Sequence, residues 1–589
     1  MNWTTQQMDK NQVTSHDEPI VVLQGPGSDL FKQHHALLQN AAKAVRTRNY
    51  WSPFPENPSP KSYGETAQAA GVAAIEALFG QNYPLQQPGE QARIATEQSP
   101  YGVKLDVKYP DCTPDALIQA GLHAQTAWQK IGVAGRLGIL LEGLVRLNKR
   151  SHEIAHAVML TTGQGALMAF QAGAPHAQER ALEVLAYAWK AMADIPTEAH
   201  WEKPQGKQIQ ALKKHFTIVG RGISLVIGCA TFPTWNTYPG LFAALATGNP
   251  VIVKPHPNAV LPIAISISIL REVIAEQGLD ANILTLSLSA NPQVTQQLAV
   301  HPAVRSIDYT GSNAFGQWLC DHAKQARIYA EMAGINGIII ESTNQYAGML
   351  RNLAFTLSLY SGQMCTTPQN VYIPRDGIQT DQGHKTFEQI GQDLANAVTQ
   401  LLSDPPTAQA ILGAIGSKQT LKRLHAAQQS GQVVLASKKL RNDHFPAAQI
   451  HTPLIVALQE KDHETYECEC FGPVSYLIAT SSAHAAIELA QSVICRHGAL
   501  ILGVYSTHPD FIERVITASQ AAKVALSINL TQSVYVNQSA SFSDYHGSGA
   551  NPAANASYTN LAFVADRFAI VQRREHIAAT DTTDSNLRH

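Results

Sequence analysis

The feature that most restricts the fold of this chain is an alternation of short apolar runs and helical patterns that begins at Ile223. The apolar runs, rich in Val, Ile and Leu, lie at 223–228, 250–255, 283–288 and 306–310. Helical patterns separate them at 238–246, 260–276 and 293–299. Such an alternation is typical of a doubly wound α/β fold with a parallel sheet. Ligands bind beyond the carboxyl ends of the strands in such sheets, so the segments of interest are 229–233, 254–257 and 310–316.

The rest of the chain predicts further domains. Its 589 residues exceed the roughly 250 to 300 that one hydrophobic core supports. Before the alternation, helices are expected at 29–46 and 62–79, around a proline-rich stretch, 50–60, that wraps on the body. Thr113 as N-cap, with Pro114 at the first helical position, predicts a helix to about residue 131. More helix is expected at 136–161 and 174–192, a second α/β block at 329–529, and a terminal strand at 567–572.

Composition and charge exclude several function classes. Lys and Arg number 43 against 45 Asp and Glu, so no basic surface for a nucleic acid is expected. The first 17 residues are polar, and no uncharged run approaches the ~18 residues of a membrane span, which predicts a cytoplasmic protein with no membrane partner. Seven scattered cysteines predict free thiols, and no spacing predicts a metal site.

Cys365 is the first candidate for chemistry. It lies in Ser361-Gly-Gln-Met-Cys-Thr-Thr, after a helical pattern and before an apolar strand, 371–374. A cysteine at such a junction, among small polar residues, can be exposed and activated, whereas a structural cysteine more often lies inside an apolar run. Read alone, the pattern fits a structural role more often than a catalytic one.

Glu331 is the second candidate. It lies among apolar and small residues at the edge of a predicted strand. Burial of a carboxylate generally raises its pKa, which suits a general base that works near neutral pH. A solvated acid or a salt bridge at the strand edge is the commoner interpretation of such a residue on its own.

Several motifs that follow one another in a fixed order make a catalytic role for Cys365 and Glu331 the favoured interpretation. They are Thr231-Phe-Pro, Gly248-Asn-Pro-Val-Ile-Val-Lys-Pro, Tyr309-Thr-Gly-Ser, Glu331, Cys365 and Glu469-Cys-Phe-Gly-Pro-Val. Together, over about 115–535, they resemble the aldehyde dehydrogenase superfamily, and the 34 residues between Glu331 and Cys365 match the usual family interval.

The resemblance implies a fold, a reaction and a role for each residue. The implied fold is α/β, with a Rossmann-like cofactor domain at 111–328, an α/β catalytic domain at 329–530, an N-terminal extension at 1–110 and a C-terminal return and oligomerisation segment at 531–589. Cys365 would attack the aldehyde to give a thiohemiacetal and then a thioester, and Glu331 would activate the water that hydrolyses it. The implied cofactor-binding residues are Lys254 at the adenosine ribose, Gly311, Ser312 and Gly316 near the pyrophosphate, and Glu469 and Phe471 at the nicotinamide ribose and ring.

Two departures from the family pattern bear on the chemistry. The family usually has Asn where this chain has Thr231, so the oxyanion hole depends on Thr231, on the backbone N–H of Cys365, or on Asn236 further along. NAD-preferring members often have Glu where this chain has Pro257. Loss of that carboxylate permits a 2′-phosphate, so NADP is the expected cofactor, with NAD as the alternative.

Within the superfamily, three segments resemble the phenylacetic acid degradation branch, PaaN. They are the N-terminal 50–64, Lys254-Pro-His-Pro and Gly549-Ala-Asn-Pro-Ala-Ala-Asn-Ala-Ser. The resemblance implies a CoA-linked semialdehyde as substrate and a homodimer or homotetramer, whose subunits the strand at 567–572 could join. A CoA-acylating dehydrogenase and a non-catalytic protein with this fold remain alternatives.

Overall fold

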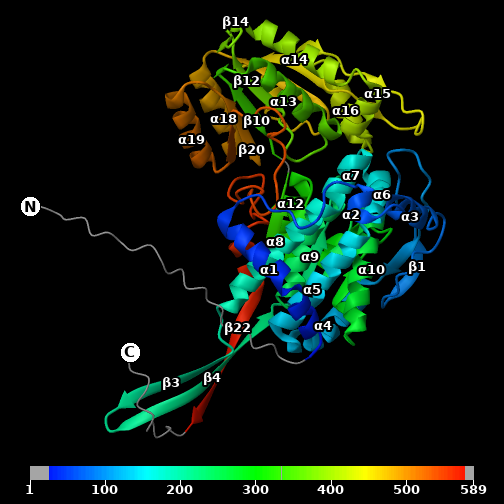
Figure 1. Ribbon diagram of the computed structural model, residues 1–589, viewed down its shortest axis with the longest axis vertical. Helices are drawn as coiled ribbons and strands as arrows, with labels where there is room; N and C mark the ends of the chain where they lie inside the picture. Colours follow the sequence, from blue (N-terminus) through cyan, green and yellow to red (C-terminus); the bar gives the residue numbers. More distant parts are fainter. Residues whose placement is uncertain (1–24, 333, 578–589) are drawn as a thin grey trace, which may run out of the picture.

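The computed structural model describes residues 25–332 and 334–577. The polar N-terminus, 1–17, on which the cytoplasmic prediction partly rests, lies outside the described residues. The chain forms two α/β lobes and a long arm of strands that projects from one of them (Figure 1).

A sheet of five parallel strands forms the first lobe, and its spatial order is β7-β6-β5-β8-β9. The strands are β5 (Ile223–Ile227), β6 (Val251–Lys254), β7 (Leu284–Leu286), β8 (Val304–Thr310) and β9 (Arg327–Glu331). They alternate with α9 (Pro233–Ala246), α10 (Leu261–Glu276), the short 3-10 helix η1 (Ala281–Ile283), α11 (Gln293–Val300) and α12 (Asn313–His322). Every residue of β5 is buried, which explains its unbroken apolar sequence. The predicted α/β class is confirmed.

Helices from the N-terminal third cover this sheet. They are α1 (Ser28–Thr47), α2 (Pro60–Tyr63), α3 (Ala67–Glu76), α4 (Pro114–Lys130), α5 (Gly132–Lys149), α6 (Ser151–Thr162), α7 (Ala166–Gly173) and α8 (Pro175–Ala193), with a hairpin of β1 (Glu90–Ile94) and β2 (Tyr109–Cys112). Helices α1, α5 and α8 share one large core with α9 and α10. Helices α11 and α12 and the start of α4 pack on the other face of the sheet.

A seven-stranded sheet forms the second lobe, in the spatial order β15-β18-β19-β12-β10-β20-β21. Its strands are β10 (Gly337–Ile340), β12 (Asn370–Pro374), β15 (Gln432–Leu435), β18 (Leu454–Gln459), β19 (Val474–Thr480), β20 (Ile501–Tyr505) and β21 (Ala525–Ile528), and only β15 pairs antiparallel. The surrounding helices are α13 (Tyr346–Ser358), η2 (Leu359–Gly362), α14 (Phe387–Leu401), α15 (Pro405–Ile411), α16 (Lys418–Ala427), α17 (His463–Tyr466), α18 (Ala483–His497) and α19 (Pro509–Ala522). Short strands β11 (Ser342–Thr343), β13 (Ile378–Thr380) and β14 (Gly383–Lys385), and the pair β16 (Lys439–Leu440) and β17 (Ile450–His451), lie at its margins.

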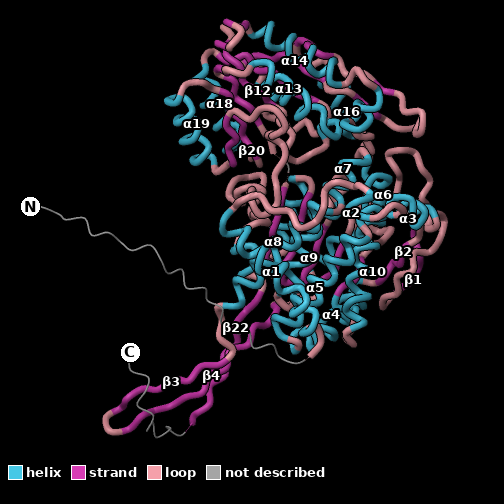
Figure 2. The backbone as a smooth tube through the Cα atoms, in the orientation of Figure 1, coloured by secondary structure: helices cyan, strands magenta, loops and turns pink. Residues whose placement is uncertain are grey.

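The arm consists of β3 (Glu198–Gln205), β4 (Gln208–Gly220) and β22 (Phe568–Ile577), in the order β22-β4-β3 (Figure 2). The helix α20 (Leu561–Ala565) leads into β22. The sequence predicted the last strand as one that could join subunits. It pairs with β4 of its own chain over its full length, which leaves the link between subunits a prediction. Its other edge is unpaired within the described residues.

The structure corrects several helix predictions. The helix expected at 62–79 is two helices, α2 and α3, because the chain turns at Gly64, whose φ is +97°. The helix expected at 136–161 is α5 and α6, which meet at Arg150. Thr113 occupies the N-cap position of α4, but its side chain makes no capping hydrogen bond. The sequence did not predict α7 or the hairpin of β3 and β4.

The predicted free thiols are confirmed, since all seven cysteines are unpaired. Among the helices of the described residues, none has the length and apolarity that crossing a membrane requires.

Candidate active site

The parallel strands of the first lobe bring the predicted site segments to one edge. Strand β5 pairs in parallel with both β6 and β8, and β8 pairs in parallel with β9. Their carboxyl ends therefore lie at the same edge of the sheet. Lys254 ends β6, Thr310 ends β8 and Glu331 ends β9. The edge predicted from the alternation is thus the place where these residues meet.

Cys365 comes from the second lobe, just after a constrained turn. Tyr360, Ser361 and Gly362 all have positive φ, at 53°, 50° and 67°, a conformation that costs free energy for non-glycine residues. Buried hydrogen bonds hold the turn: Tyr360 Oη donates to the Thr162 carbonyl at 2.7 Å and Ser361 Oγ donates to the Gly413 carbonyl at 3.0 Å. A side chain at Gly362 would meet the Gly472 carbonyl at 2.2 Å.

The peptide on either side of the nucleophile is also fixed. Asn336 Nδ2 donates to the Cys365 carbonyl at 2.7 Å, and Thr366 Oγ1 donates to the Asn537 carbonyl at 2.7 Å. Because the turn and these bonds leave the backbone little freedom, the thiol is held in one place. Such preorganisation favours a nucleophile that must meet a carbonyl carbon in a defined geometry.

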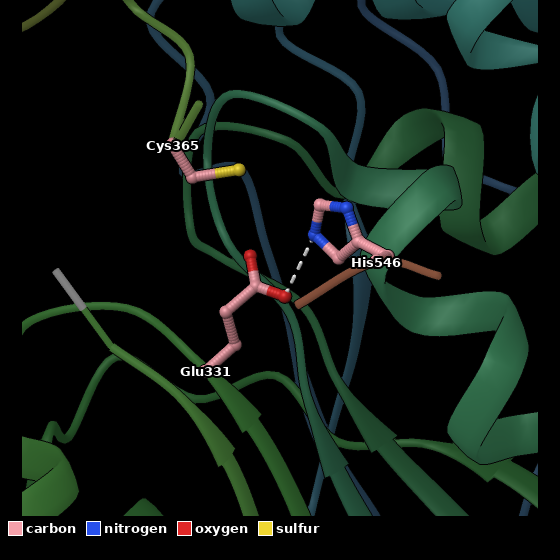
Figure 3. A group of neighbouring side chains, drawn as sticks. All are labelled: Glu331, Cys365 and His546. Carbon is pink, nitrogen blue, oxygen red and sulfur yellow. Dashed lines mark ion pairs between the residues drawn. The ribbon is translucent and has the colours of Figure 1, made fainter. Parts of the chain in front are cut away.

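Glu331, Cys365 and His546 point toward one another (Figure 3). Their reactive atoms all lie within 4.8 Å of one another. His546 Nε2 lies 3.0 Å from Glu331 Oε2, although the two groups are not aligned as a hydrogen bond. Both residues are almost fully buried, with 3% of Glu331 and 5% of His546 exposed. The sequence had predicted Glu331 and Cys365 but not His546.

The electrostatics keep the Cys365 thiol protonated before reaction. Burial raises its pKa well above the ordinary value, and the charge of the Glu331 carboxylate, within 4.8 Å of the sulfur, raises it further. A thiol of this kind is a weak nucleophile until a base removes its proton. Glu331 is the carboxylate in place to do so.

Three residues near this group bear on the oxyanion hole. Thr231 Oγ1 lies 4.0 Å from the sulfur of Cys229, and the Thr231 carbonyl accepts from Gln164 Nε2 at 2.7 Å. Asn236, in the first turn of α9, is 6% exposed, and its Nδ2 has no hydrogen-bond partner. The Cys229 thiol donates to Asn236 Oδ1 at 3.3 Å. Burial raises the pKa of Cys229, so it stays a donor and leaves the amide N–H₂ of Asn236 free for another acceptor.

A cavity of about 710 Å³ leads to the nucleophile. Cys365, Asn236 and His546 line it, whereas Glu331 and Thr231 do not. Apolar side chains form much of its wall, and they are Leu167, Met168, Phe232, Trp235, Phe355, Leu359, Met364, Ile411 and Val534. The N-terminal stretch that was expected only to wrap on the body contributes Tyr50, Ser52 and Glu56.

The cavity also holds acidic groups. Glu56, Glu179 and Asp544 line it, and no Lys or Arg occurs among its described lining residues. Burial raises the pKa of Glu179 to about 7, partly offset by its hydrogen bond from Ser52. Glu56 is paired with His176 at 2.9 Å, mainly by a hydrogen bond that lowers the pKa of Glu56.

The predicted adenosine-side residues surround the end of β6. Burial lowers the pKa of Lys254, and within the described part of the chain no carboxylate forms an ion pair with it. Pro257 follows, and its carbonyl accepts from Thr96 Oγ1 at 2.6 Å. Glu97 is committed elsewhere, because it accepts from the backbone N–H of Val260 and Leu261 at the start of α10. A half-buried amine without an anionic partner fits the ribose of a dinucleotide.

Gly311, Ser312 and Gly316 surround the start of α12. Ser312 is its N-cap residue, and the Ser312 carbonyl accepts from Tyr309 Oη at 2.9 Å. A side chain at Gly311 would meet Tyr309, and one at Gly316 would meet the sulfur of Met332 at 2.4 Å. The two glycines therefore have a packing reason to be there, in addition to the cofactor role that the resemblance implies.

Glu469 and Phe471 belong to the second lobe. Glu469 is exposed by surface area, yet the protein around it raises its pKa to about 7 by desolvation, against the opposing charge of Arg423. The Phe471 carbonyl accepts from Arg423 Nε at 3.2 Å, and Gln369 Oε1 accepts from the neighbouring Cys470 N–H at 2.6 Å. These bonds fix the loop that carries both residues.

The donor atoms of Glu331, Cys365 and His546 are also close enough together to hold a metal ion. The sequence predicted no metal site, since His546 lies far from the other two in the chain and in no ligand-spaced motif. A carboxylate, a thiol and an imidazole in one pocket equally suit proton transfer around a nucleophile.

Comparison with known proteins identifies the family. The model of the aldehyde dehydrogenase family matches residues 98–565. The chain belongs to the aldehyde dehydrogenase family. It is 23% identical to a 1-pyrroline-5-carboxylate dehydrogenase of Bacillus subtilis (strain 168), over 73% of this chain and 82% of that protein. It is also 23% identical to benzaldehyde dehydrogenase [NAD(+)] of Pseudomonas putida, over 64% of this chain and 73% of that protein.

Solved structures of this family share the architecture. The crystal structure of an NAD-dependent aldehyde dehydrogenase from Burkholderia multivorans has a TM-score of 0.92 and 51% identity, over 94% of this chain and 99% of that one. A Thermus 1-pyrroline-5-carboxylate dehydrogenase with bound NAD has a TM-score of 0.69 at 18% identity, over 90% of this chain and 99% of that one, a likeness of fold alone. Family membership makes the protein an oxidoreductase that acts on a small-molecule aldehyde with a nicotinamide cofactor.

Proposed function

We propose that this aldehyde dehydrogenase oxidises its substrate to a carboxylic acid, with Cys365 as nucleophile and Glu331 as general base. The observation that carries the proposal is that the buried Glu331 carboxylate lies within 4.8 Å of the Cys365 thiol, which lines the cavity. The bound nicotinamide dinucleotide supplies the hydride acceptor. Lys254, Gly311, Ser312, Gly316, Glu469 and Phe471 are the residues that would hold it.

The protein's own groups account for the other steps. Glu331 takes the thiol proton as the sulfur adds to the aldehyde carbon, which gives a thiohemiacetal on Cys365. Oxidation then leaves a thioester on the same sulfur. Once Glu331 has lost that proton, it takes one from water and the water oxygen bonds to the thioester carbon. The carbon–sulfur bond then breaks to release the acid, and the leaving thiolate takes the proton back from Glu331.

For the oxyanion we favour Asn236 over Thr231 as the side-chain donor, beside the backbone N–H of Cys365. Asn236 lines the cavity with an unpartnered N–H₂, whereas Thr231 does not line it. Loss of one such donor typically costs ~100- to 1,000-fold in kcat. Asn236→Ala should therefore slow the first turnover by that order, and Thr231→Val should leave it nearly unchanged. The reverse ranking would return the role to Thr231.

For the cofactor we propose that NADP is accepted as well as NAD. Pro257 stands where NAD-preferring members often have Glu, so it supplies no carboxylate to repel a 2′-phosphate, and Lys254 and His256 are close to it in the chain. The 51% identical Burkholderia protein is described as NAD-dependent, which supports NAD. Initial rates at matched concentrations of the two dinucleotides decide between them.

For the substrate, the sequence resemblance to the PaaN branch supports a CoA-linked semialdehyde. The apolar wall suits the hydrocarbon part of such a molecule. With no Lys or Arg among the described lining residues, the CoA phosphates would have to lie outside the cavity. A panel that contains benzaldehyde, an aliphatic aldehyde and a CoA-thioester semialdehyde tests this choice, and equal efficiency with and without the CoA group would exclude it.

The first experiment tests activity itself. Purified protein is mixed with aldehyde and NAD or NADP, with and without free CoA, and nicotinamide absorbance is followed. Acid formation without CoA supports hydrolysis, whereas strict dependence on CoA supports the acylating alternative. Cys365→Ala should abolish turnover and keep dinucleotide binding, and Cys495→Ala, which removes an exposed thiol, is the matched control. Normal turnover in Cys365→Ala would refute the mechanism, and no turnover in the native protein would favour the non-catalytic alternative.

A further inference from the structure

The Gly/Ala/Asn-rich segment at 549–557, which the proposed function leaves without a role, lies directly against Glu331. Met332 N–H donates to the Ala553 carbonyl at 2.7 Å, and Asn555 N–H donates to the Ala330 carbonyl at 3.1 Å. Ala330 N–H in turn donates to Asn555 Oδ1 at 2.7 Å. The residues before and after Glu331 are thus both bonded to this segment, so the segment pairs antiparallel with the end of β9 at Glu331.

The same C-terminal return carries His546, and three contacts hold its ring over the carboxylate. The ring packs edge-on to Trp235, with centroids 4.4 Å apart, and stacks over Tyr558 at 6.0 Å. Its backbone N–H donates to Thr559 Oγ1 at 3.3 Å. These contacts leave Nε2 directed at Glu331 Oε2, 3.0 Å away, with no aligned hydrogen bond to any described group.

Proton balance shows why Glu331 needs a partner. Oxidation of an aldehyde by NAD(P)⁺ and water gives the carboxylate, NAD(P)H and two protons. In the proposed mechanism Glu331 takes the thiol proton and must lose it before it can take one from water. The proton taken from water returns from Glu331 to the Cys365 thiolate that leaves the thioester, and the product acid releases the second net proton. Glu331 is 3% exposed and does not line the cavity, so it cannot release the first proton directly to bulk water. His546 touches Glu331 and lines the cavity.

We propose that His546 is a positioning residue that receives the proton from Glu331 and returns the base to its ionised form between steps. The proposal rests on the proposed function. In the transfer, the O–H bond of protonated Glu331 breaks and an N–H bond forms at Nε2, which gives an imidazolium and a carboxylate. The imidazolium then loses a proton to water in the cavity, with no change of oxidation state.

The surroundings of His546 are mixed in charge. The titratable and charged groups that face it or its packing partners are Glu331, Cys365, Asp544, Tyr558 and Arg180. Arg180 is already paired with Glu183 at 2.8 Å, and Asp544 accepts from the Ala540 N–H at 2.7 Å. Tyr558 Oη is bonded to Thr310 Oγ1 at 2.8 Å. Among the described residues, Glu331 is therefore the carboxylate that lies next to the imidazole.

The test uses the full-length protein and compares His546→Ala with His34→Ala. His34 is a matched control, because its Nε2 also contacts a half-buried carboxylate, Glu142, at 2.7 Å but far from Cys365 in the fold. We expect His546→Ala to keep a burst of reduced nicotinamide of about one per active site and to lower steady-state turnover by ~10- to 100-fold, below the range for loss of a base itself. His34→Ala should keep both. If the native protein shows neither a burst nor turnover, the proposed function itself is contradicted, and not this inference alone.

Added imidazole separates proton transfer from a structural role. The base can enter the cavity of about 710 Å³ beside the truncated side chain. We expect imidazole to restore turnover of His546→Ala several-fold, in proportion to its uncharged form as pH rises, and to leave the native protein unchanged. Should Ala at this position prevent folding, His546→Gln keeps the volume and is tested in the same way. Native turnover in a folded variant, or a loss that imidazole does not reverse, would overturn the inference.

Discussion

Replacement of Glu331 by Gln should separate acylation from hydrolysis. Gln keeps the shape of the side chain and its place at the end of β9, but it cannot accept a proton. Rapid mixing with aldehyde and cofactor should give a burst of reduced nicotinamide near one per active site, followed by a turnover that is ~100- to 10,000-fold slower. At ~1.4 kcal/mol for each factor of ten, the hydrolysis barrier rises by about 3 to 5 kcal/mol.

The pH dependence of the burst follows from the causes of the Cys365 shift. Burial is the largest cause that raises the pKa of this thiol, and the charge of Glu331 is the next. Gln removes the charge, so the pKa falls but stays raised by burial. Without a base, the burst must wait for thiolate, so its rate should increase with pH across the alkaline range. In the native protein Glu331 accepts the proton, and the burst should depend on pH less steeply.

Two further measurements test whether Glu331 is needed for hydrolysis of the thioester and not for its formation. Mass spectrometry should find the acyl group on Cys365 of the stalled variant, and an added thiol should speed its release, because a thiolate attacks without needing a base. Glu142→Gln, which alters another Glu–His contact, is the control and should behave as the native protein. A slow first turnover with no burst, even at high pH, would refute the reasoning and make Glu331 the obligatory activator of Cys365.

Three other predictions concern cofactor choice, stability and assembly. Pro257→Glu should shift the ratio of kcat/KM values from NADP toward NAD, since a carboxylate there repels a 2′-phosphate, and an unchanged ratio would mean that residue 257 does not face the ribose. Arg567→Met should destabilise the protein by about 3 to 5 kcal/mol in chemical unfolding, because it leaves the buried Asp308 carboxylate without its bidentate partner; adding Asp308→Asn should recover part of that loss. The arm exposes Ile570 and Val571, 50% and 55% accessible, beside a free strand edge, so we expect a dimer or tetramer in sedimentation and weaker association in Ile570→Lys.

The sequence predicted the first lobe well because its strands are short, buried and unbroken. The predicted strand at 306–310 corresponds to β8, which begins two residues earlier. The predicted strand at 250–255 corresponds to β6 and is one residue longer than β6 at each end. The predicted ends of helices were less accurate where the conformation of a single residue ends the helix. The left-handed conformation at Gly64 divides a single helical pattern into two helices, and periodicity alone contains no sign of it. The domain limits at 110, 328 and 530 remain predictions.

The site was predicted where an ordered series of motifs existed and was missed where contact depended on the fold. Cys365 and Glu331 belong to the series, and the structure brings them together. His546 lies 215 residues after Glu331 in the chain and reaches it only because the folded chain returns to the first lobe. No local sequence pattern predicts that contact. Asn236 was an open alternative to Thr231 in the sequence, and it lies in the first turn of α9, where it lines the cavity. For His546, the nearby sequence signal was the unusual 549–557 segment.

That segment also explains how a site divided between two lobes keeps its geometry. Glu331 belongs to the first lobe and Cys365 to the second, so any shift between the lobes would separate base from thiol. Asn551 Nδ2 donates to the Ala499 carbonyl of the second lobe at 2.9 Å, while Asn555 Nδ2 donates to the Ile328 carbonyl of the first at 3.1 Å. Two asparagines four residues apart thus fasten both lobes beside Glu331. Because Asn can donate to one backbone group and accept from another, these two residues join the lobes, and we expect the segment to hold Glu331 and Cys365 at a fixed separation.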